Sequence, residues 1–219
     1  MEKSPAYQLY HYFRSSCSYR VRIALNFKNL ACEFHPIELR KNEQNKADYL
    51  DLNPQGIVPS LITPDGTLIT QSLAIIEYLE ELHPTPALLP KNPELRAKIR
   101  AFAQAIACEV HPVNNLRVLN YLKNDLNINE PQVNLWYQHW VNLTFISLEK
   151  IAKLNAGDFC FGGIISLADL ALIPQIYNAR RYHTDMTAYP YLTQIEQNCL
   201  EHPAFQKAHP DNYLPATAP

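Results

Sequence analysis

Glycine is scarce in this sequence: only 5 of its 219 residues are glycine, and none precedes Gly56. The P-loop of nucleotide-binding proteins and the G-x-G-x-x-G fingerprint of dinucleotide-binding proteins both need closely spaced glycines. The N-terminal part therefore contains neither motif, which excludes the usual ATP and NAD sites there. The H-E-x-x-H motif of zinc proteases and the G-x-S-x-G motif of serine hydrolases are also missing.

An excess of either charge is missing as well, because 19 Lys and Arg residues stand against 21 Asp and Glu residues, a formal net charge of -2. Without a basic field or a Lys/Arg run, a dedicated nucleic-acid binder is disfavoured. A composition of 47% hydrophobic and 18% charged residues is typical of a soluble globular chain of one or two domains. We therefore expect a small-molecule partner.

Paired cysteine motifs are absent, since no C-x-x-C occurs among the five cysteines. Their odd number predicts reduced thiols in a reducing compartment. Cys108 and His111 alone do not make a metal site, so no metal is predicted. The N-terminal segment lacks the apolar stretch of a signal peptide, and Asp169 interrupts the most apolar later segment, residues 167–174. We expect a cytoplasmic protein that does not bind a membrane.

The order β-α-β-α-β-β-α is predicted for a first domain, residues 1–83. Its elements are a strand at 7–12, a helix after Ser15-Ser16, a strand at 32–39, a helix at 43–51, a hairpin over 58–70 and a helix capped by Ser72. Proline-rich residues 84–93 predict a linker. Helical periods then dominate residues 94–219, which predicts an all-α second domain. Its helices are expected at about 94–124, 130–154, 166–182 and 193–199, with a capping box at Ser166 and Asp169.

A cluster of hydroxyls and one thiol follows the first predicted strand, in the segment Arg14-Ser-Ser-Cys-Ser-Tyr-Arg20. At the N-terminus of the next helix, unpaired N–H groups and the positive end of the helix dipole favour an anion. We therefore predict a site for a thiolate or a carboxylate. Alternatively, the serines only cap the helix and Cys17 is a small buried residue.

Two further features suit an extended anionic ligand. The peptide bond Val58-Pro59 has two possible geometries. A cis bond would expose the backbone of Val58 for pairing with an extended peptide. Alternatively, the bond is trans and the proline lies at a sheet edge. Gln71-Ser72 adds an amide and a hydroxyl at the N-terminus of another predicted helix, which also suits a carboxylate.

Together these features resemble the thioredoxin-like domain of glutathione transferases, and longer motifs resemble the zeta class of that family. The motifs cover residues 14–25, 53–59, 71–80, 84–90, 111–119, 166–169 and 174–181, and thus extend over nearly the whole chain. The resemblance implies the glutathione transferase fold, with an α/β thioredoxin-like N-terminal domain and an all-α C-terminal domain. It also implies glutathione as cofactor and a homodimer.

The resemblance further implies which residues form the site. The implied catalytic residues are Ser15, Ser16 and Cys17, which would line the sulfur of glutathione. The implied glutathione-binding residues are Ser15, Ser16, Cys17, Ser18, Tyr19, Arg20, Gln44, Val58, Gln71, Ser72 and Asn114. The implied substrate-binding residues are Arg14, Asn115, Arg117 and Arg181. Arg180 and Arg181 could instead be a solvated helix end, and Asp169 is expected to be structural.

The activity implied for the zeta class is the glutathione-dependent cis-trans isomerisation of maleylacetoacetate to fumarylacetoacetate in tyrosine and phenylalanine catabolism. A thiolate adds to the conjugated double bond, the resulting single bond rotates, and the thiolate leaves. Arginines suit the two carboxylates of this small diacid. The alternatives are maleylpyruvate isomerisation, a general glutathione transferase or peroxidase activity, and a non-enzymatic glutathione-transferase-like binding protein.

Overall fold

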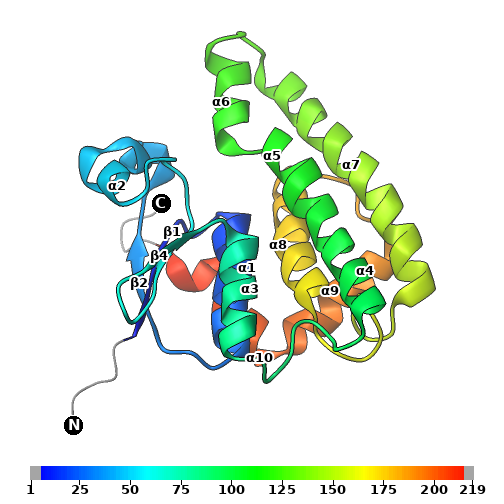
Figure 1. Ribbon diagram of the computed structural model, residues 1–219. Coiled ribbons are helices and arrows are strands. Elements are labelled where there is room, and N and C mark those ends of the chain that lie inside the picture. The colour runs from blue at the N-terminus through cyan, green and yellow to red at the C-terminus, as the bar shows by residue number, and fades with distance from the viewer. Residues whose placement is uncertain (1–5, 215–219) are drawn as a thin grey trace. The chain divides into compact units, whose positions relative to one another are not determined.

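The computed structural model describes residues 6–214, and its contacts divide the chain into two compact units. The described part of the first unit comprises residues 6–87 and 202–214, and the second unit is Leu88–Glu201. Figure 1 labels most of the helices and strands.

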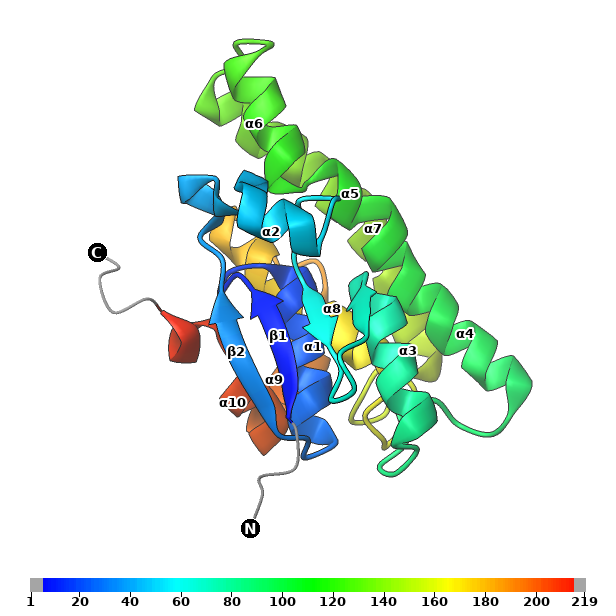
Figure 2. The same cartoon turned by 60° about the vertical axis from the view of Figure 1, so that its left-hand side comes forward.

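A four-stranded mixed sheet forms the centre of the first unit (Figure 2). Its strands are β1 (Tyr7–His11), β2 (Cys32–Pro36), β3 (Ser60–Ile62) and β4 (Leu68–Thr70), in the order β2-β1-β3-β4. β1 pairs with β2 in parallel and with β3 antiparallel, and β3 pairs antiparallel with β4. Leu9 and its partner Leu61 are fully buried, whereas Tyr10 points to the other face and meets the ring of Tyr49.

The helices of the first unit that precede residue 88 follow the predicted order, and one more helix comes from the end of the chain. They are α1 (Ser16–Phe27), α2 (Ala47–Leu52), α3 (Ser72–Leu82) and α10 (Pro203–Ala208), with short 3-10 turns η1 (Leu39–Lys41), η2 (Glu43–Asn45) and η4 (Pro210–Tyr213). α1 packs against α3 and against α10. The thioredoxin-like order of the N-terminal elements is thereby confirmed.

Two local predictions in this unit are wrong. The helix expected at 43–51 is divided, because left-handed Asn42 (φ 59°) precedes η2 and only Ala47–Leu52 is α-helical. Ser72 is not the N-cap of α3. The N-cap is Gln71, with a φ of 69°, and Ser72 is the first helical residue.

The second unit is entirely helical apart from its connections. Its elements are α4 (Pro93–Gln104), a π-helical turn η3 (Ala105–Val110), α5 (His111–Val113), α6 (Leu116–Asn124), α7 (Glu130–Asn155), α8 (Leu167–Arg181) and α9 (Pro190–Glu201). The helix expected at 94–124 is therefore interrupted, and Asn115 caps a new helix there. α8 is buried along most of its length, against α4 and α9.

The end of the chain departs from the predicted boundaries. The sequence predicts one helical domain over 94–219, but residues 202–214 belong to the first unit. The physical reason is the contact of α10 with α1, where Phe205 is fully buried and Arg22 Nε donates to the carbonyl of Ala208 at 3.0 Å. A six-residue helix carries too short a period to predict this partner from sequence.

Within residues 6–214, none of the helices has the length and apolarity needed to cross a membrane. The same residues contain no group of three or more His, Cys, Asp or Glu side chains arranged to hold a metal ion.

Candidate active site

The first turn of α1 carries the serine-cysteine motif. Ser15 is the N-cap, and its Oγ accepts a hydrogen bond from the backbone N–H of Ser18 at 3.2 Å. Ser16 is buried and Cys17 is partly exposed. No acidic residue lies in this turn, so the positive end of the helix faces no competing carboxylate from its own first turn.

Cys17 differs from the two buried cysteines, Cys160 and Cys199, whose pKa values are raised by burial. Cys32 is partly exposed like Cys17, but desolvation still raises its pKa to about 12. These three thiols therefore stay protonated at neutral pH. Cys17 lies partly exposed at the N-terminus of α1, so the alternative that Cys17 is a small buried residue is wrong.

The loop before β3 contains the cis peptide bond Val58-Pro59 that the sequence suggested as one of two geometries. A buried polar network supports this loop. Asn53 Nδ2 and the Tyr49 hydroxyl both donate to the carbonyl of Ile57, at 2.9 and 2.6 Å, and both contact Ser60 Oγ at 3.0 Å. The residues on either side of Val58-Pro59 are thus anchored by side chains from α2 and its C-terminus.

The third motif lies at the N-terminus of α3. The Gln71 side chain does not cap this helix but donates from Nε2 to Gln55 Oε1 at 3.1 Å. Ser72 Oγ accepts a hydrogen bond from Arg20 Nη1 at 3.2 Å. The N-terminal turn of α3 is therefore tied to α1 by Arg20 and to the loop before Val58 by Gln55.

These contacts bring the three sequence motifs together. Phe13, directly before Arg14, belongs to the same buried cluster as Val58. Gln55 joins the loop of Val58 to α3, and Arg20 joins α1 to α3. Helix N-termini, the loop of Val58 and hydroxyl groups thus converge within one unit, an arrangement that can bind an extended anionic peptide.

Gln44 lies in η2, beside the loop that leads to Val58. A Cβ added to Gly56, whose φ is 60°, would lie only 3.3 Å from the Gln44 carbonyl oxygen and 2.9 Å from Asn45 Oδ1, so the two segments are in close contact. Gln44 Nε2 donates to Asn42 Oδ1, and Gln44 Oε1 has no hydrogen-bond partner in the described part of the chain.

Ser18 and Tyr19 of α1 contact residues of their own unit. Ser18 and Tyr19 are buried, Ser18 Oγ accepts from the backbone of Tyr12, and the Tyr19 ring packs edge-on against His209. These two side chains hold α1 in the unit. Arg14 is partly exposed, with its guanidinium 5.0 Å from the centre of the Phe13 ring.

Three predicted site residues of the second unit, Asn114, Asn115 and Arg117, lie at or near the start of α6. Asn114 is buried, donates from Nδ2 to the carbonyl of Tyr137 at 3.1 Å and has no partner for Oδ1 among the described residues. Asn115 Oδ1 caps α6 by accepting from the backbone N–H of Arg117 at 3.1 Å, and Arg117 itself is exposed. The amide of Asn115 is therefore already engaged, whereas Asn114 retains an acceptor for a ligand N–H.

Arg181 ends α8 and differs from its neighbour Arg180. Arg180 forms an ion pair with Glu196 on α9, with Nε 3.0 Å from Oε1. Arg181 is exposed, donates to Asn178 Oδ1 at 3.1 Å, and lies 5.9 Å from the ring centres of Tyr177 and Tyr182. Of these two arginines, Arg180 is thus paired with a carboxylate, whereas Arg181 has no carboxylate partner among the described residues.

Sequence reasoning missed the residues that support these motifs. Arg22, fully buried on α1, donates to the carbonyls of Tyr12 and Phe13 at 3.5 and 3.0 Å, which fixes the segment before Arg14. Tyr49 is only 4% exposed and anchors the Val58 loop. The sequence does carry a signal for Arg22: an arginine on the inner face of an amphipathic helix is rarely buried unless it has hydrogen-bond partners.

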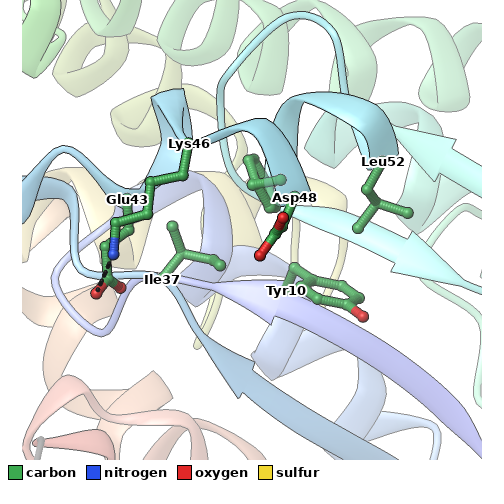
Figure 3. A pocket seen from close by; sticks show the side chains of 7 residues that line it. Tyr10, Ile37, Glu43, Lys46, Asp48 and Leu52 are labelled. Carbon is green, nitrogen blue, oxygen red and sulfur yellow. Dashed lines mark hydrogen bonds and ion pairs between the residues drawn. The ribbon is translucent and has the colours of Figure 1, made fainter.

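A cavity of about 380 Å³ lies under α2 and is separate from the predicted site residues. Its lining residues are Tyr10, Ile37, Glu43, Lys46, Asp48, Tyr49 and Leu52. Figure 3 shows the Glu43–Lys46 ion pair at one end and Asp48 directed toward Tyr10. None of the predicted glutathione or substrate residues lines it.

Comparison with known proteins agrees with this arrangement. Residues 9–87 match the model of the family described as "Glutathione S-transferase, N-terminal domain". The chain is 45% identical to the probable maleylacetoacetate isomerase of Vibrio cholerae over 207 residues, which covers 93% of this chain and 95% of the relative.

Two solved structures are similar over nearly their whole length. One is a maleylpyruvate isomerase described as a bacterial glutathione S-transferase of the zeta class, with a TM-score of 0.92, 38% identity and coverage of 96% of this chain and all (100%) of that one. The other is the maleylacetoacetate isomerase of Methylobacterium extorquens with bound malonate and glutathione, with a TM-score of 0.92, 36% identity and coverage of 97% and 100%.

Proposed function

Because this chain belongs to the zeta class of glutathione transferases, we propose that it is a glutathione-dependent cis-trans isomerase that converts maleylacetoacetate to fumarylacetoacetate. The observation that carries the proposal is the geometry of Ser15. Its Oγ accepts the N–H of Ser18, which leaves the hydroxyl proton to be donated to an anion at the N-terminus of α1.

The residues of this chain fit the tripeptide. Ser15, Ser16 and Cys17 surround the sulfur, the backbone of Val58 pairs with the cysteinyl residue, and Gln71 and Ser72 bind the γ-glutamyl end. Gln44 reaches the glycyl end, and Asn114 offers its free Oδ1 to a ligand N–H. Buried polar atoms without partners, at Arg20, Gln44 and Asn114, support this assignment, because such atoms are usually satisfied in native proteins.

Bound glutathione supplies a thiolate that adds reversibly to the double bond conjugated with the substrate carbonyl, so that rotation can occur. The hydroxyls of Ser15 and Ser16 lower the pKa of that thiol by donating to the sulfur, and the N-terminus of α1 favours the same negative charge. No proton has to be gained or lost over a complete cycle. Charge stabilisation is therefore the main task of these side chains.

Arginines hold the substrate. Among the described residues Arg181 has only an amide oxygen as hydrogen-bond partner, which leaves most of its planar fork for a carboxylate. Arg14 and Arg117 are further anchors, whereas the Asn115 amide is engaged at the cap of α6. The malonate in the related Methylobacterium extorquens structure is also a diacid, which supports a diacid substrate here.

We also propose a homodimer that acts in the cytoplasm, in tyrosine and phenylalanine breakdown. The five free cysteines support a reducing compartment. Apolar side chains of α7 that are exposed in the single chain, at Leu135, Leu143 and Leu154, support a second copy, and sedimentation velocity tests it.

The test of the proposed activity measures loss of maleylacetoacetate absorbance with purified chain. We expect isomerisation with glutathione, none without it, and none with S-methylglutathione, which keeps the peptide contacts but has no free thiol. Isomerisation that continues without glutathione would overturn the proposal.

Maleylpyruvate is the second candidate substrate, favoured by the similarity to a maleylpyruvate isomerase. Both compounds need one thiolate and carboxylate anchors. Their kcat/KM values, measured with the same enzyme preparation, decide between them.

Arg181→Ala and Arg181→Lys test the carboxylate anchor. Loss of a charge-assisted hydrogen bond should cost roughly 1.5 to 3 kcal/mol in transition-state stabilisation, or about one to two orders of magnitude in kcat/KM. Arg181→Lys should recover only part of the kcat/KM that Arg181→Ala loses, because the point charge of lysine does not replace the planar guanidinium. Arg180→Ala, which removes the ion pair with Glu196, is the matched control. Wild-type kcat/KM in both Arg181 variants would place the anchor at Arg14 or Arg117.

A further inference from the structure

Arg20 is buried, and among residues 6–214 it has no partner of opposite charge. It lies on α1 with 1% of its surface exposed, and its only hydrogen bond among the described residues runs from Nη1 to Ser72 Oγ at 3.2 Å. Nε and Nη2 have no hydrogen-bond partner there. A guanidinium has five N–H donors, so most of its hydrogen-bonding capacity is unused.

Such an arrangement costs stability. An arginine stays protonated in proteins, and a buried charge that is not paired carries a large desolvation penalty. The other fully buried arginine of α1, Arg22, donates to three backbone carbonyls and thereby offsets this cost. Arg20 has no such set of acceptors, so its charge is not explained by stabilisation of the fold.

The Arg20 contact decides how Ser72 can bind. Arginine only donates hydrogen bonds, so Ser72 Oγ must accept, and its own proton is left for another acceptor. Ser72 is the first residue of α3, an 11-residue helix, and the Gln71 side chain does not cap it. The charge of the guanidinium and the positive end of the α3 dipole therefore both make the electrostatic potential at the Ser72 hydroxyl more positive, which favours an anion there.

We infer that Arg20 is a positioning residue that makes this end of the site selective for a ligand with an ionised carboxylate. It acts through Ser72, by fixing the hydroxyl as a donor and by supplying a buried positive charge behind it. This inference rests on the proposed binding of glutathione and identifies its γ-glutamyl α-carboxylate as the group that Arg20 selects.

The experiment compares two ligands by titration calorimetry: glutathione, and 4-aminobutanoyl-cysteinyl-glycine, which differs only by loss of that carboxylate. The unmodified chain should bind glutathione about 10- to 100-fold more tightly than the analogue, as expected for a charge-assisted hydrogen bond. In Arg20→Met this ratio should fall to near one while the Kd of the analogue changes little. A purely structural role would weaken both ligands equally and leave the ratio unchanged.

Two further variants keep the test decisive. Arg20→Gln keeps a hydrogen-bond donor to Ser72 but has no charge, so the preference for glutathione over the analogue should also be mostly lost. This variant replaces Arg20→Met as the test if Arg20→Met does not fold. Ser72→Ala should lower the ratio, and adding Arg20→Met to it should lower it little further, because the two residues act as a unit. Arg40→Met, which removes an exposed arginine paired with Glu38, is the matched control and should keep the full ratio.

Failure of the inference is distinct from failure of the proposed function. If the unmodified chain prefers glutathione but Arg20→Met and Arg20→Gln keep that preference, Arg20 is structural and the inference is wrong. If the unmodified chain does not bind glutathione, the proposed function itself is wrong.

Discussion

Ser15 and Ser72 are prepared for an anion in the same way. Each hydroxyl oxygen accepts from a group that cannot accept in return, the backbone N–H of Ser18 in one case and the guanidinium of Arg20 in the other. Each serine therefore has its proton available for a ligand. Because both lie at helix N-termini, the proposed function assigns one anionic group of the peptide to each serine.

Ser15→Ala should lower kcat by about one to three orders of magnitude and change the Kd of glutathione much less. The hydroxyl acts on the charge of the sulfur, and loss of one preorganised donor has effects of this size in other enzymes. Turnover at saturating glutathione and the ultraviolet absorbance of the bound thiolate, followed against pH, measure both effects. The thiol pKa of bound glutathione should rise.

Two variants control for this result. Ser15→Thr keeps a hydroxyl and a helix cap, so it should recover turnover. Cys17→Ala should retain appreciable isomerisation, since the attacking sulfur is glutathione's. An unchanged kcat in Ser15→Ala would exclude the role given to the hydroxyl, and complete loss in Cys17→Ala with glutathione still bound would indicate a protein thiolate.

His11 makes stability depend on pH. Burial, with Arg22 and His35 nearby, lowers the pKa of His11 from 6.5 to about 3, and its Nδ1 faces the donor Arg22 Nη1 at 3.3 Å. Below pH 6.5 the unfolded chain binds a proton that the folded chain does not. The free energy of unfolding should therefore fall as the pH drops from 6.5 toward 3, by about 2 kcal/mol at pH 5 from this residue.

Urea unfolding at a series of pH values tests this dependence in the unmodified chain and in His11→Gln, which cannot take up a proton. The variant should be less stable at neutral pH and should lose less stability on acidification. His139→Gln makes the same change at an exposed ring and controls for loss of an imidazole. Parallel curves for the unmodified chain and His11→Gln would contradict the assignment.

Among the elements, α8 depends on one carboxylate at its start. Asp169 is fully buried and accepts hydrogen bonds from the backbone N–H groups of Cys160 and Ser166 and from Ser166 Oγ, at 2.8 to 2.9 Å. Asp169→Asn replaces one acceptor oxygen with a donor that faces these N–H groups. We expect a loss of about 2 to 4 kcal/mol in the free energy of unfolding, measured in urea.

Asp185 offers a matched control, because its exposed carboxylate also accepts two hydrogen bonds, from the N–H and hydroxyl of Thr187. Asp185→Asn should cost clearly less, since water can replace the lost contacts. Equal losses in the two variants would mean that burial of Asp169 adds nothing.

The elements show what local sequence could predict. The sequence predicts α7 nearly to the residue, and it predicts the capping box of α8 from Ser166 and Asp169. The cap of α3 was misassigned because a positive φ at Gln71 is not encoded by a glycine. The contact of Arg20 with Ser72, 52 residues apart, has no local signature, so the sequence could indicate both motifs but not their link.

At the scale of the whole molecule, the chain returns to its first unit after completing the second. α10 follows α9 in sequence but packs on α1, and Arg22 connects its last carbonyl, at Ala208, with the segment before Arg14. The end of the chain therefore supports the segment that presents the serine-cysteine motif. Sequence reasoning assigned this end to the helical domain because only the helical pattern, and not the partner, is visible locally.

Phe205→Ala tests this assignment of α10. Phe205 is fully buried, and removal of a buried phenyl ring typically costs about 3 to 5 kcal/mol. Native-state hydrogen exchange should therefore become faster in β1 and α1, and the Kd of glutathione should rise with the loss of order before Ser15. Phe145→Ala on α7 removes an equally buried ring from the second unit, so it should speed exchange in α7 and α9 first. If Phe205→Ala instead loosened α8 and α9 and left β1 and α1 protected, α10 would belong energetically to the helical unit.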